Sequence, residues 1–577
     1  MEKRWVIKPE PKRETIAKLI EDVGITKPLA TIMAQRGISN YEEAKAFFRP
    51  EIEDLHDPFL MKNMEEAVTR IEQAIAANEN ILIYGDYDVD GTSAVALMYS
   101  YLTMDYDQVG YYIPDRYKEG YGISEIGMQF AIDNSFSLVI ALDCGTKAIE
   151  QIAFAKEYGV DVIVCDHHTP GDKLPDAIVL NPKQEGCEYP YDELCGCGIG
   201  FKLAQAINQT RGGTIEDIYH LLDLVMVAIG ADIVPMTGEN RILAYYGMHV
   251  LNNNPRIGFQ QLLALAQKTG ELSVTDVVFT IAPRINAAGR IDTGNKAVEL
   301  LLAETMDEVD DISKAINQHN EVRKDLDREM TKEALEMIVN DDWLLNAKST
   351  VVFKEDWHKG VVGIVASRLT ETYYRPTIVL TESNGMAVGS ARSVKGFNVY
   401  EAINACADLL VQFGGHFYAA GLTMEMEKVD DFKTRFNEVV ESSISDEMLV
   451  PEIEIDCEID FRDIYEEQRS GIPRFYRILK QLAPFGPGNM RPVFVSRNVR
   501  DAGSSRVLKD EHLKLSLVQE EYPDIVLNGI AFGMAHWYEI LQNGPVDIAY
   551  TIEENHWNGY VNLQLMVKDM KASKRPL

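Results

Sequence analysis

Short apolar runs alternate with amphipathic segments between about residues 65 and 255. Ile81 to Tyr84 is followed by helical spacing over Thr92 to Leu102, and Leu138 to Leu142 by helical spacing over Ala148 to Tyr158. A further apolar run, Val162 to Cys165, comes next. Strands that alternate with helices in this way are typical of α/β folds with parallel strands. The pattern therefore predicts a doubly wound parallel sheet.

The flanking segments have other patterns. The first 55 or so residues have helical spacing. Residues 303 to 340 contain no Pro or Gly, and their spacing predicts one long helix. Residues 349 to 445 alternate strand and helix again, and alternating runs after residue 450 predict a small β-barrel. We therefore expect an N-terminal helical cap (1–60), a first α/β domain (61–300), a connecting helix (301–345), a second α/β domain (346–448) and the barrel (449–577).

Length and composition agree with a large globular protein. A chain of 577 residues suggests roughly three to four domains. Its first residues lack the apolar core of a signal peptide, and no stretch reaches the roughly 18 apolar residues of a membrane span, so we expect a cytoplasmic protein with no membrane partner. The seven cysteines are then expected to be reduced thiols. The net charge of -34 argues against broad duplex binding but allows a local basic channel for one strand.

Acidic side chains stand at the end of each of the three apolar runs. Asp86, Asp88 and Asp90 follow the first run, Asp143 follows the second, and Asp166-His167-His168 follows the third. Because parallel strands deliver their last side chains to one edge of a sheet, we expect these groups to converge. Like charges at such short range raise one another's pKa, and bound cations are the simplest way to neutralise them. The sequence therefore indicates a metal-dependent phosphoesterase.

Other interpretations of these motifs are less favoured. Asp90-Gly91-Thr92-Ser93 also has the form of a helix start, and adjacent histidines are often structural, so each motif alone is weak evidence. Cys187, Cys195 and Cys197 lack the paired spacing and the fourth ligand of a zinc site, which favours buried thiols. The glycines near the first aspartates match neither the Walker nor the Rossmann spacing, which disfavours an ATP-driven motor.

Seven motifs then identify a family by their order along the chain. They are Gly85-Asp86-Tyr87-Asp88-Val89-Asp90-Gly91, Asp143-Cys144-Gly145, Asp166-His167-His168, Cys195-Gly196-Cys197-Gly198-Ile199-Gly200-Phe201-Lys202, Ala231-Asp232-Ile233-Val234-Pro235, Arg284-Ile285-Asn286-Ala287-Ala288-Gly289-Arg290 and Gly414-Gly415-His416. The ordered set resembles the DHH phosphoesterases, and specifically the RecJ single-strand DNA exonucleases. The resemblance implies a DHH domain (61–300), a DHH-associated domain (346–448) and an OB-like C-terminal barrel (449–577).

The resemblance also implies a metal centre. The metal ligands would be Asp86, Asp88, Asp90, Asp143, His167 and Asp232, with Asp166 as a supporting partner; Asp88, Asp90, Asp143, His167, His168 and His416 would be catalytic. Which of the three loop aspartates is not a direct ligand stays open, as does the choice between ligation and support for His168. Carboxylate oxygen suits manganese and magnesium, and imidazole favours manganese, so two manganese ions are expected, with magnesium as the alternative.

A pocket for the end of a DNA strand is implied as well. Arg116 and Tyr121 belong to a segment that resembles a RecJ loop in contact with the 5′ end, and Ser390 and Arg392 to a strand that would bind the terminal phosphate. Arg290 is a further candidate for the phosphate, although its charge could instead pair with the acidic site. Arginine suits this task because its planar fork makes paired hydrogen bonds to phosphate oxygens. Such a pocket would measure off one nucleotide, as an exonuclease requires.

The function implied by the resemblance is a 5′ to 3′ exonuclease specific for single-stranded DNA. It would release nucleoside 5′-monophosphates in DNA repair and recombination, with a helicase and a single-stranded-DNA-binding protein as candidate partners. Two alternatives stay open. One is a DHH-superfamily phosphodiesterase for oligoribonucleotides or cyclic dinucleotides, although those enzymes are usually shorter and lack the barrel. The other is a non-catalytic DHH-fold replication scaffold, which the intact aspartates and histidines disfavour.

Overall fold

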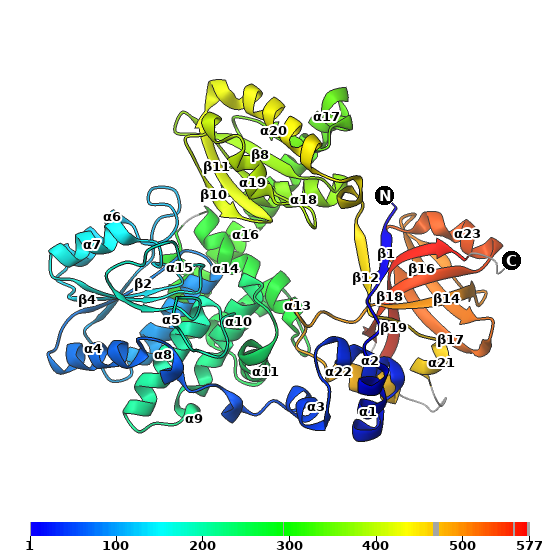
Figure 1. Cartoon of the computed structure of the whole chain (residues 1–577), viewed down its shortest axis with the longest axis horizontal. Helices are drawn as coiled ribbons and strands as arrows, with labels where there is room; N and C mark the ends of the chain where they lie inside the picture. Colours follow the sequence, from blue (N-terminus) through cyan, green and yellow to red (C-terminus); the bar gives the residue numbers. More distant parts are fainter. Residues whose placement is uncertain (1, 292, 466–471, 558–559, 574–577) are drawn as a thin grey trace. The chain divides into compact units, whose positions relative to one another are not determined.

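The chain folds into two compact units in the computed structural model, which describes residues 2–291, 293–465, 472–557 and 560–573 (Figure 1). The central unit is Asp54–Val450, and the terminal unit combines Met1–Glu53 with Pro451–Leu577. The two ends of the chain therefore build one unit together. Among the described helices, none combines the length and the apolar character that a membrane span requires.

The central unit contains a five-stranded parallel sheet in the order β3-β2-β4-β5-β6. Its strands are β2 (Ile81–Gly85), β3 (Val109–Tyr112), β4 (Leu138–Leu142), β5 (Asp161–Cys165) and β6 (Ile178–Leu180). The inner strands β2 and β4 are buried along their whole length, which explains their uninterrupted apolar runs.

Helices cover both faces of this sheet. On one face, α6 (Glu125–Asp133) and α7 (Ile149–Glu157) share an apolar core with the strands. On the other face lie α4 (Met64–Ala76), α5 (Val89–Leu102) and α8 (Gly196–Thr210) (Figure 1). The predicted doubly wound parallel sheet is confirmed. Helix α5 begins at Val89, three residues before its predicted start, because Asp88 caps it.

Further helices follow the parallel sheet in the sequence. They are α9 (Ile215–Ile218), α10 (Leu222–Asp232), α11 (Gly238–Asn253), α12 (Ile257–Leu265), α13 (Val274–Asp276), α14 (Ala282–Ile291), α15 (Asn295–Leu302) and α16 (Met306–Val339). Thr305 caps α16, a helix of 34 residues. Its N-terminal part packs on α12, α14 and α15, and its C-terminal part shares a core with the second sheet and α18 (Val362–Tyr373). One continuous helix therefore contacts both halves of the central unit.

The second sheet of the central unit has the order β10-β11-β9-β8-β7. Its strands are β7 (Thr350–Phe353), β8 (Thr377–Ser383), β9 (Met386–Arg392), β10 (Gln412–His416) and β11 (Ala419–Glu425), and its other helices are α17 (Asp342–Asn346), α19 (Val399–Asn404) and α20 (Val429–Ser443). Only β7 and β8 are parallel. The register aligns Arg392 of β9, Ala419 of β11 and His416 of β10 in one row across three strands.

The terminal unit is built around a closed barrel. Its strands are β13 (Cys457–Glu458), β14 (Phe494–Asp501), β15 (Arg506–Leu508), β16 (His512–Gln519), β17 (Tyr522–Ala531), β18 (Val546–Trp557) and β19 (Tyr560–Ala572), and its helices are α21 (Phe461–Ile464), α22 (Arg474–Lys480) and α23 (Tyr538–Asn543). The barrel closes because β14 pairs with both β18 and β16, which links β14, β18, β19, β17 and β16 in a ring. Five strands in such a ring have the architecture of an OB-fold, as predicted.

The N-terminal segment belongs to this barrel unit. Helices α1 (Arg13–Val23), α2 (Lys27–Gln35) and α3 (Tyr41–Phe48) follow the predicted helical spacing, and apolar side chains of α1 and α2 join the core of the barrel. A strand that the helical pattern did not indicate, β1 (Arg4–Ile7), pairs in parallel with β12 (Glu452–Ile455). The N-terminal strand therefore pairs with a strand that lies more than 400 positions later in the sequence.

Candidate metal centre and active site

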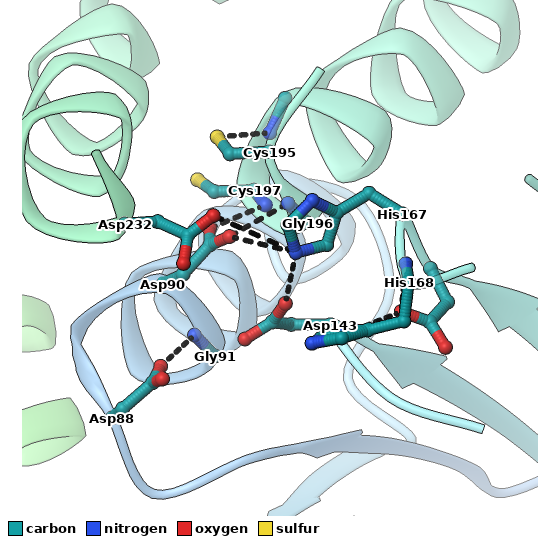
Figure 2. A network of polar contacts seen from close by, with 12 residues as sticks. Asp88, Asp90, Gly91, Asp143, His167, His168, Cys195, Gly196, Cys197 and Asp232 are labelled. Carbon is teal, nitrogen blue, oxygen red and sulfur yellow. Dashed lines mark hydrogen bonds and ion pairs between the residues drawn. The ribbon is translucent and has the colours of Figure 1, made fainter. Parts of the chain in front are cut away.

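The acidic loops of the central unit meet at one edge of its parallel sheet. Strands β2, β4 and β5 are neighbours and end side by side, so the loops that carry Asp86 to Asp90, Asp143 and Asp166 to His168 converge. Asp232, the last residue of α10, joins them from a separate element. Figure 2 shows the carboxylates around the ring of His167. The convergence predicted from the strand ends is thus present in the structure.

His167 lies at the centre of the cluster. Its Nε2 atom is 3.2 Å from Oδ1 of Asp143, 3.6 Å from Oδ2 of Asp232 and 4.0 Å from Oδ2 of Asp90 (Figure 2). Burial, and then the charge of His168, lower the pKa of His167 to about 3, so the ring is neutral at pH 7. Unprotonated imidazole nitrogen is the form that binds metal ions.

Asp90 is held by the start of a helix. The backbone N–H groups of Gly196 and Cys197, at the beginning of α8, each donate to one carboxylate oxygen of Asp90 at 2.7 Å (Figure 2). Helix N-termini favour negative charge, because their first N–H groups have no partner within the helix. The helix thus fixes the orientation of Asp90 while each oxygen keeps a second lone pair for a cation.

Asp143 adopts a backbone conformation that is rare for a residue with a side chain. Its φ angle is 60°, in the left-handed region, where short polar residues are tolerated best. Its neighbour across the site is Gly196, where a Cβ atom would lie only 2.5 Å from Cβ of Asp143. The glycine therefore allows α8 to approach the aspartate closely.

Asp166 supports the cluster from behind. Its carboxylate accepts hydrogen bonds from the backbone N–H of Thr146 at 2.9 Å, from that of His168 at 3.1 Å, and from the His168 ring at 2.7 Å. Burial opposes ionisation of Asp166, but the bonds from His168 and Thr146 prevail and lower its pKa. Asn181 completes this arrangement, because its amide donates to Thr146 and to the His168 carbonyl. Sequence reasoning missed Thr146 and Asn181, which belong to none of the quoted motifs.

The other two aspartates of the first loop have different surroundings. Asp86 is fully buried, and one of its oxygens accepts the N–H of Gly122 at 3.2 Å, while the other has no hydrogen-bond partner among the residues that the structure describes. Asp88 is the N-cap of α5 and accepts the N–H of Gly91 at 3.0 Å. A helix does start in this loop, but its cap is Asp88, and Asp90 lies in the first turn of α5.

The electrostatics of the cluster match a cation site. Burial raises the pKa of Asp86 and Asp143, and neighbouring aspartates raise both further. Burial followed by repulsion from Asp88 raises the pKa of Asp90 to about 7, and burial followed by repulsion from Asp90 raises that of Asp232 to about 8. Such carboxylates resist ionisation unless positive charge is supplied.

Donor atoms in the cluster are also free to bind a cation. Oδ2 of Asp86, Oδ1 of Asp143 and Nε2 of His167 are buried and have no hydrogen-bond partner in the described part of the chain. Within the described ranges, two groups have ligand atoms that lie within 4.8 Å of one another: Asp143 with His167 and His168, and Asp90 with His167 and Asp232. Carboxylate oxygens with imidazole nitrogen suit manganese and magnesium. The residues present therefore fit divalent cations of this kind.

The structure does not support a zinc site at the cysteines. No cysteine belongs to a metal-capable group in the part of the chain that is described. Cys195 and Cys197 are buried at the start of α8, where the Cys195 sulfur accepts the N–H of Gly198. Burial raises the pKa of both thiols, which keeps them protonated. Cys195 and Cys197 are thus buried thiols, as expected, whereas Cys187 is only half-buried.

Arginines from four separate segments gather close to this edge of the sheet. Burial lowers the pKa of Arg290 to about 10, and the positive charges of Arg116, Arg323 and Arg392 contribute to this shift. The Arg290 guanidinium donates to the carbonyl of Gly360 at 2.9 Å, and the Arg392 guanidinium donates to Oγ of Ser390 at 2.8 Å. None of the four pairs with a carboxylate among the described residues. The structure thus disfavours pairing of Arg290 with the acidic site, and Arg323, on α16, was missed because nothing in its local sequence distinguishes it.

Two further predicted residues lie near the histidines. The Tyr121 hydroxyl is 3.0 Å from Nε2 of His168 and 3.1 Å from the carbonyl of Asp143. His416 lies on β10 of the second sheet, and burial followed by the positive charge of His168 lowers its pKa. The structure therefore brings side chains from both sheets of the central unit to one place.

Three family models match successive parts of the chain. Residues 80–229 match the DHH family, N-terminal domain, residues 346–442 match the DHHA1 domain, and residues 455–569 match the RecJ OB domain. The single-stranded-DNA-specific exonuclease RecJ of Bacillus subtilis (strain 168) is 38% identical over 581 residues, which cover 99% of this chain and 71% of that protein. The chain belongs to the RecJ family. The resemblance carried by the seven motifs is thereby confirmed.

Solved RecJ structures have the same fold. RecJ of Thermus thermophilus in complex with Mn²⁺ matches with a TM-score of 0.84 and 26% identity, over 99% of this chain and 80% of that one. The Mg²⁺ complex of the same protein matches with a TM-score of 0.78 and 25% identity, over 99% and 79%. Both ions are of the kind that the donor atoms of this RecJ-family chain accommodate.

Proposed function

We propose that this chain is a metal-dependent exonuclease that shortens single-stranded DNA from its 5′ end and releases nucleoside 5′-monophosphates in DNA repair and recombination. The observation that carries the proposal is one unit with two adjacent charge clusters of opposite sign. The acidic cluster fits divalent cations, and the arginines fit a phosphate group. Membership of the RecJ family supports the choice of DNA as the substrate.

We assign the acidic residues to the metal centre. Asp86, Asp88, Asp90, Asp143, His167 and Asp232 would hold two divalent cations, preferably manganese. Cations held there would lower the pKa of a bound water and neutralise charge on the scissile phosphate. Asp166 would orient His168, and the start of α8 would orient Asp90, so that these donors keep their positions when substrate arrives.

The arginines would bind the end of the strand. Arg392, aligned by Ser390, would receive the terminal phosphate together with Arg116 and Arg290. These three guanidiniums have no carboxylate partner among the described residues, so they offer several paired hydrogen bonds to its oxygens. Tyr121 would contact the same nucleotide from the side of His168, and His416 would approach the scissile phosphate. A terminal phosphate held at a set distance from the metal centre places the next phosphodiester in reach, so that one nucleotide leaves per cycle.

The proposal distributes these tasks over the predicted segments. The DHH domain (61–300) would cleave, the DHH-associated domain (346–448) would bind the terminal phosphate, the connecting helix (301–345) would set their spacing, and the barrel (449–577) with its N-terminal cap (1–60) would grip the strand by base stacking and local positive charge. A helicase and a single-stranded-DNA-binding protein are the partners we expect, because paired DNA must be opened before it becomes a substrate. The cytoplasmic location stays a prediction.

A strand labelled at either end tests the function. With Mn²⁺, a 5′ label should appear at once in a mononucleotide, while a 3′ label stays on a shortening strand, and a blunt duplex should resist. Asp143→Ala should abolish both hydrolysis and calorimetric uptake of Mn²⁺. Early release of the 3′ label, or equal degradation of the blunt duplex, would contradict the proposal. A preference for RNA dinucleotides would favour the phosphodiesterase alternative, and an absence of Mn²⁺ uptake by the wild type would favour the scaffold.

A further inference from the structure

Tyr87 occupies an unusual place, between two proposed metal ligands. It separates Asp86 from Asp88 in the loop after β2. The guanidinium carbon of Arg116 lies 4.9 Å from the centroid of the Tyr87 ring. The ring of Tyr121 meets the same ring edge-on, at a centroid distance of 6.4 Å and an interplanar angle of 85°. One side chain thus contacts two residues that the proposed function places on the substrate.

The backbone of Tyr87 is closely confined. A Cβ atom on Gly289 would lie 2.7 Å from the Tyr87 carbonyl oxygen, and one on Gly294 would lie 3.3 Å from its Cα. Real side chains do not tolerate the first of these distances, so α14 approaches the loop only because Gly289 lacks a side chain. Gly289 directly precedes Arg290. The segment around Arg290 is therefore also positioned against Tyr87.

The loop that carries Arg116 is braced on itself. The carboxylate of Asp115 accepts the backbone N–H groups of Tyr117 and Lys118 at 2.8 and 3.0 Å, and Glu119 accepts the N–H of Asp115 at 2.7 Å. None of these contacts holds the Arg116 side chain. Its guanidinium contacts the Tyr87 ring, and among the described residues it makes no ion pair.

An aromatic ring has a chemical advantage at this place. A carboxylate that held Arg116 would neutralise the charge needed for a phosphate and would occupy its N–H groups. The face of a ring attracts the guanidinium and leaves the N–H groups at its rim available. In a site with many aspartates, such a contact would also oppose rotation of Arg116 toward the acidic cluster.

We propose that Tyr87 is a positioning residue that holds Arg116 at a set distance from Asp86 and Asp88 and thereby sets the length of the step taken from the 5′ end. The inference rests on the proposed function, since it assumes that Arg116 contacts the terminal phosphate. Asp86, Tyr87 and Asp88 would then belong to the metal-binding loop and also support the phosphate pocket through Arg116. A movement of this loop would therefore be transmitted to Arg116.

Two variants of the full chain separate the ring from the rest of the side chain. Tyr87→Phe keeps the ring face, whereas Tyr87→Leu removes it and retains a large apolar group. The measurements are initial rates on single strands with a 5′ phosphate or a 5′ hydroxyl, the lengths of the first products, and calorimetric uptake of Mn²⁺. Wild type and Tyr87→Phe should prefer the phosphorylated strand and release mononucleotides. In Tyr87→Leu the preference should fall roughly twofold to thirtyfold, the range of a cation–π contact, with longer products and unchanged Mn²⁺ uptake.

Several results would overturn the inference. An unchanged phosphate preference in Tyr87→Leu would do so, as would an equal loss in Tyr87→Phe. Loss of Mn²⁺ uptake in Tyr87→Leu would mean that the residue only supports the metal loop. A wild type that leaves single-stranded DNA intact would overturn the proposed function and this inference with it, whereas an active wild type with an unaffected Tyr87→Leu variant would overturn this inference alone.

Discussion

Replacement of Gly196 by alanine should damage the metal centre without unfolding the protein. The added Cβ would lie 2.5 Å from Cβ of Asp143, 2.6 Å from its Oδ1 and 2.7 Å from its Cα. Ordinary contacts of this kind need at least about 3.5 Å, so the start of α8 and Asp143 must separate by about 1 Å. The two N–H bonds to Asp90, each 2.7 Å long, would then stretch beyond hydrogen-bond range.

The expected loss follows from these two bonds. Each charge-assisted hydrogen bond contributes about 1.5 to 3 kcal/mol, and water replaces part of it, so the affinity for Mn²⁺ should fall at least about tenfold. A displacement of about 1 Å in a catalytic group costs about a hundredfold in rate. Titration calorimetry with Mn²⁺ and the rate of single-strand shortening measure the two effects.

Gly198 supplies a matched control on the same helix. A Cβ atom there would meet its nearest neighbours at 3.5 Å, which is ordinary van der Waals contact. Gly198→Ala should therefore bind Mn²⁺ and shorten DNA as the wild type does, with stability equal or slightly higher because alanine favours a helix. Wild-type affinity and activity in Gly196→Ala would refute the reasoning, as would equal damage in both variants.

Three other predictions concern protons, support and substrate. In the folded state the pKa of Asp90 is about 7 and that of Asp232 about 8, against the ordinary 3.8. The metal-free folded state therefore binds more protons than the unfolded state between these pH values. The contribution of the two residues to the free energy of unfolding should decline as pH rises from about 4 to about 8. Thermal denaturation in EDTA should show this decline in stability, and added Mn²⁺ should reverse it. If the wild type had the same pH dependence as the Asp90→Asn/Asp232→Asn double variant, the prediction would be wrong. Asp166→Ala removes three hydrogen bonds behind the cluster and should weaken Mn²⁺ binding about 10- to 100-fold by calorimetry; unchanged affinity would exclude a supporting role. Arg392→Ala should raise the KM for 5′-phosphorylated strands about tenfold or more and spare 5′-hydroxyl strands in steady-state assays, whereas equal effects on both would place the phosphate elsewhere.

Much of the site was predictable because its residues follow buried strands. Apolar runs such as Leu138 to Leu142 determine strands locally, and neighbouring parallel strands must end together, so Asp143 and His167 could be placed at one edge from the sequence. The position of Asp232 was inferred only from resemblance. Its element, α10, has no local feature that indicates which loop it will meet.

The amino-acid sequence by itself determined the order of strands and helices, the acidic strand ends and the family motifs, because hydrophobic periodicity and turn chemistry act over a few residues. The tertiary structure alone decided which distant segments touch. It placed the first N–H groups of α8 on Asp90, brought the charge of Arg323 on α16 within electrostatic range of Arg290, and paired β1 with β12. Such contacts depend on how whole helices and sheets pack, and packing sums many small contributions that no short stretch of sequence contains.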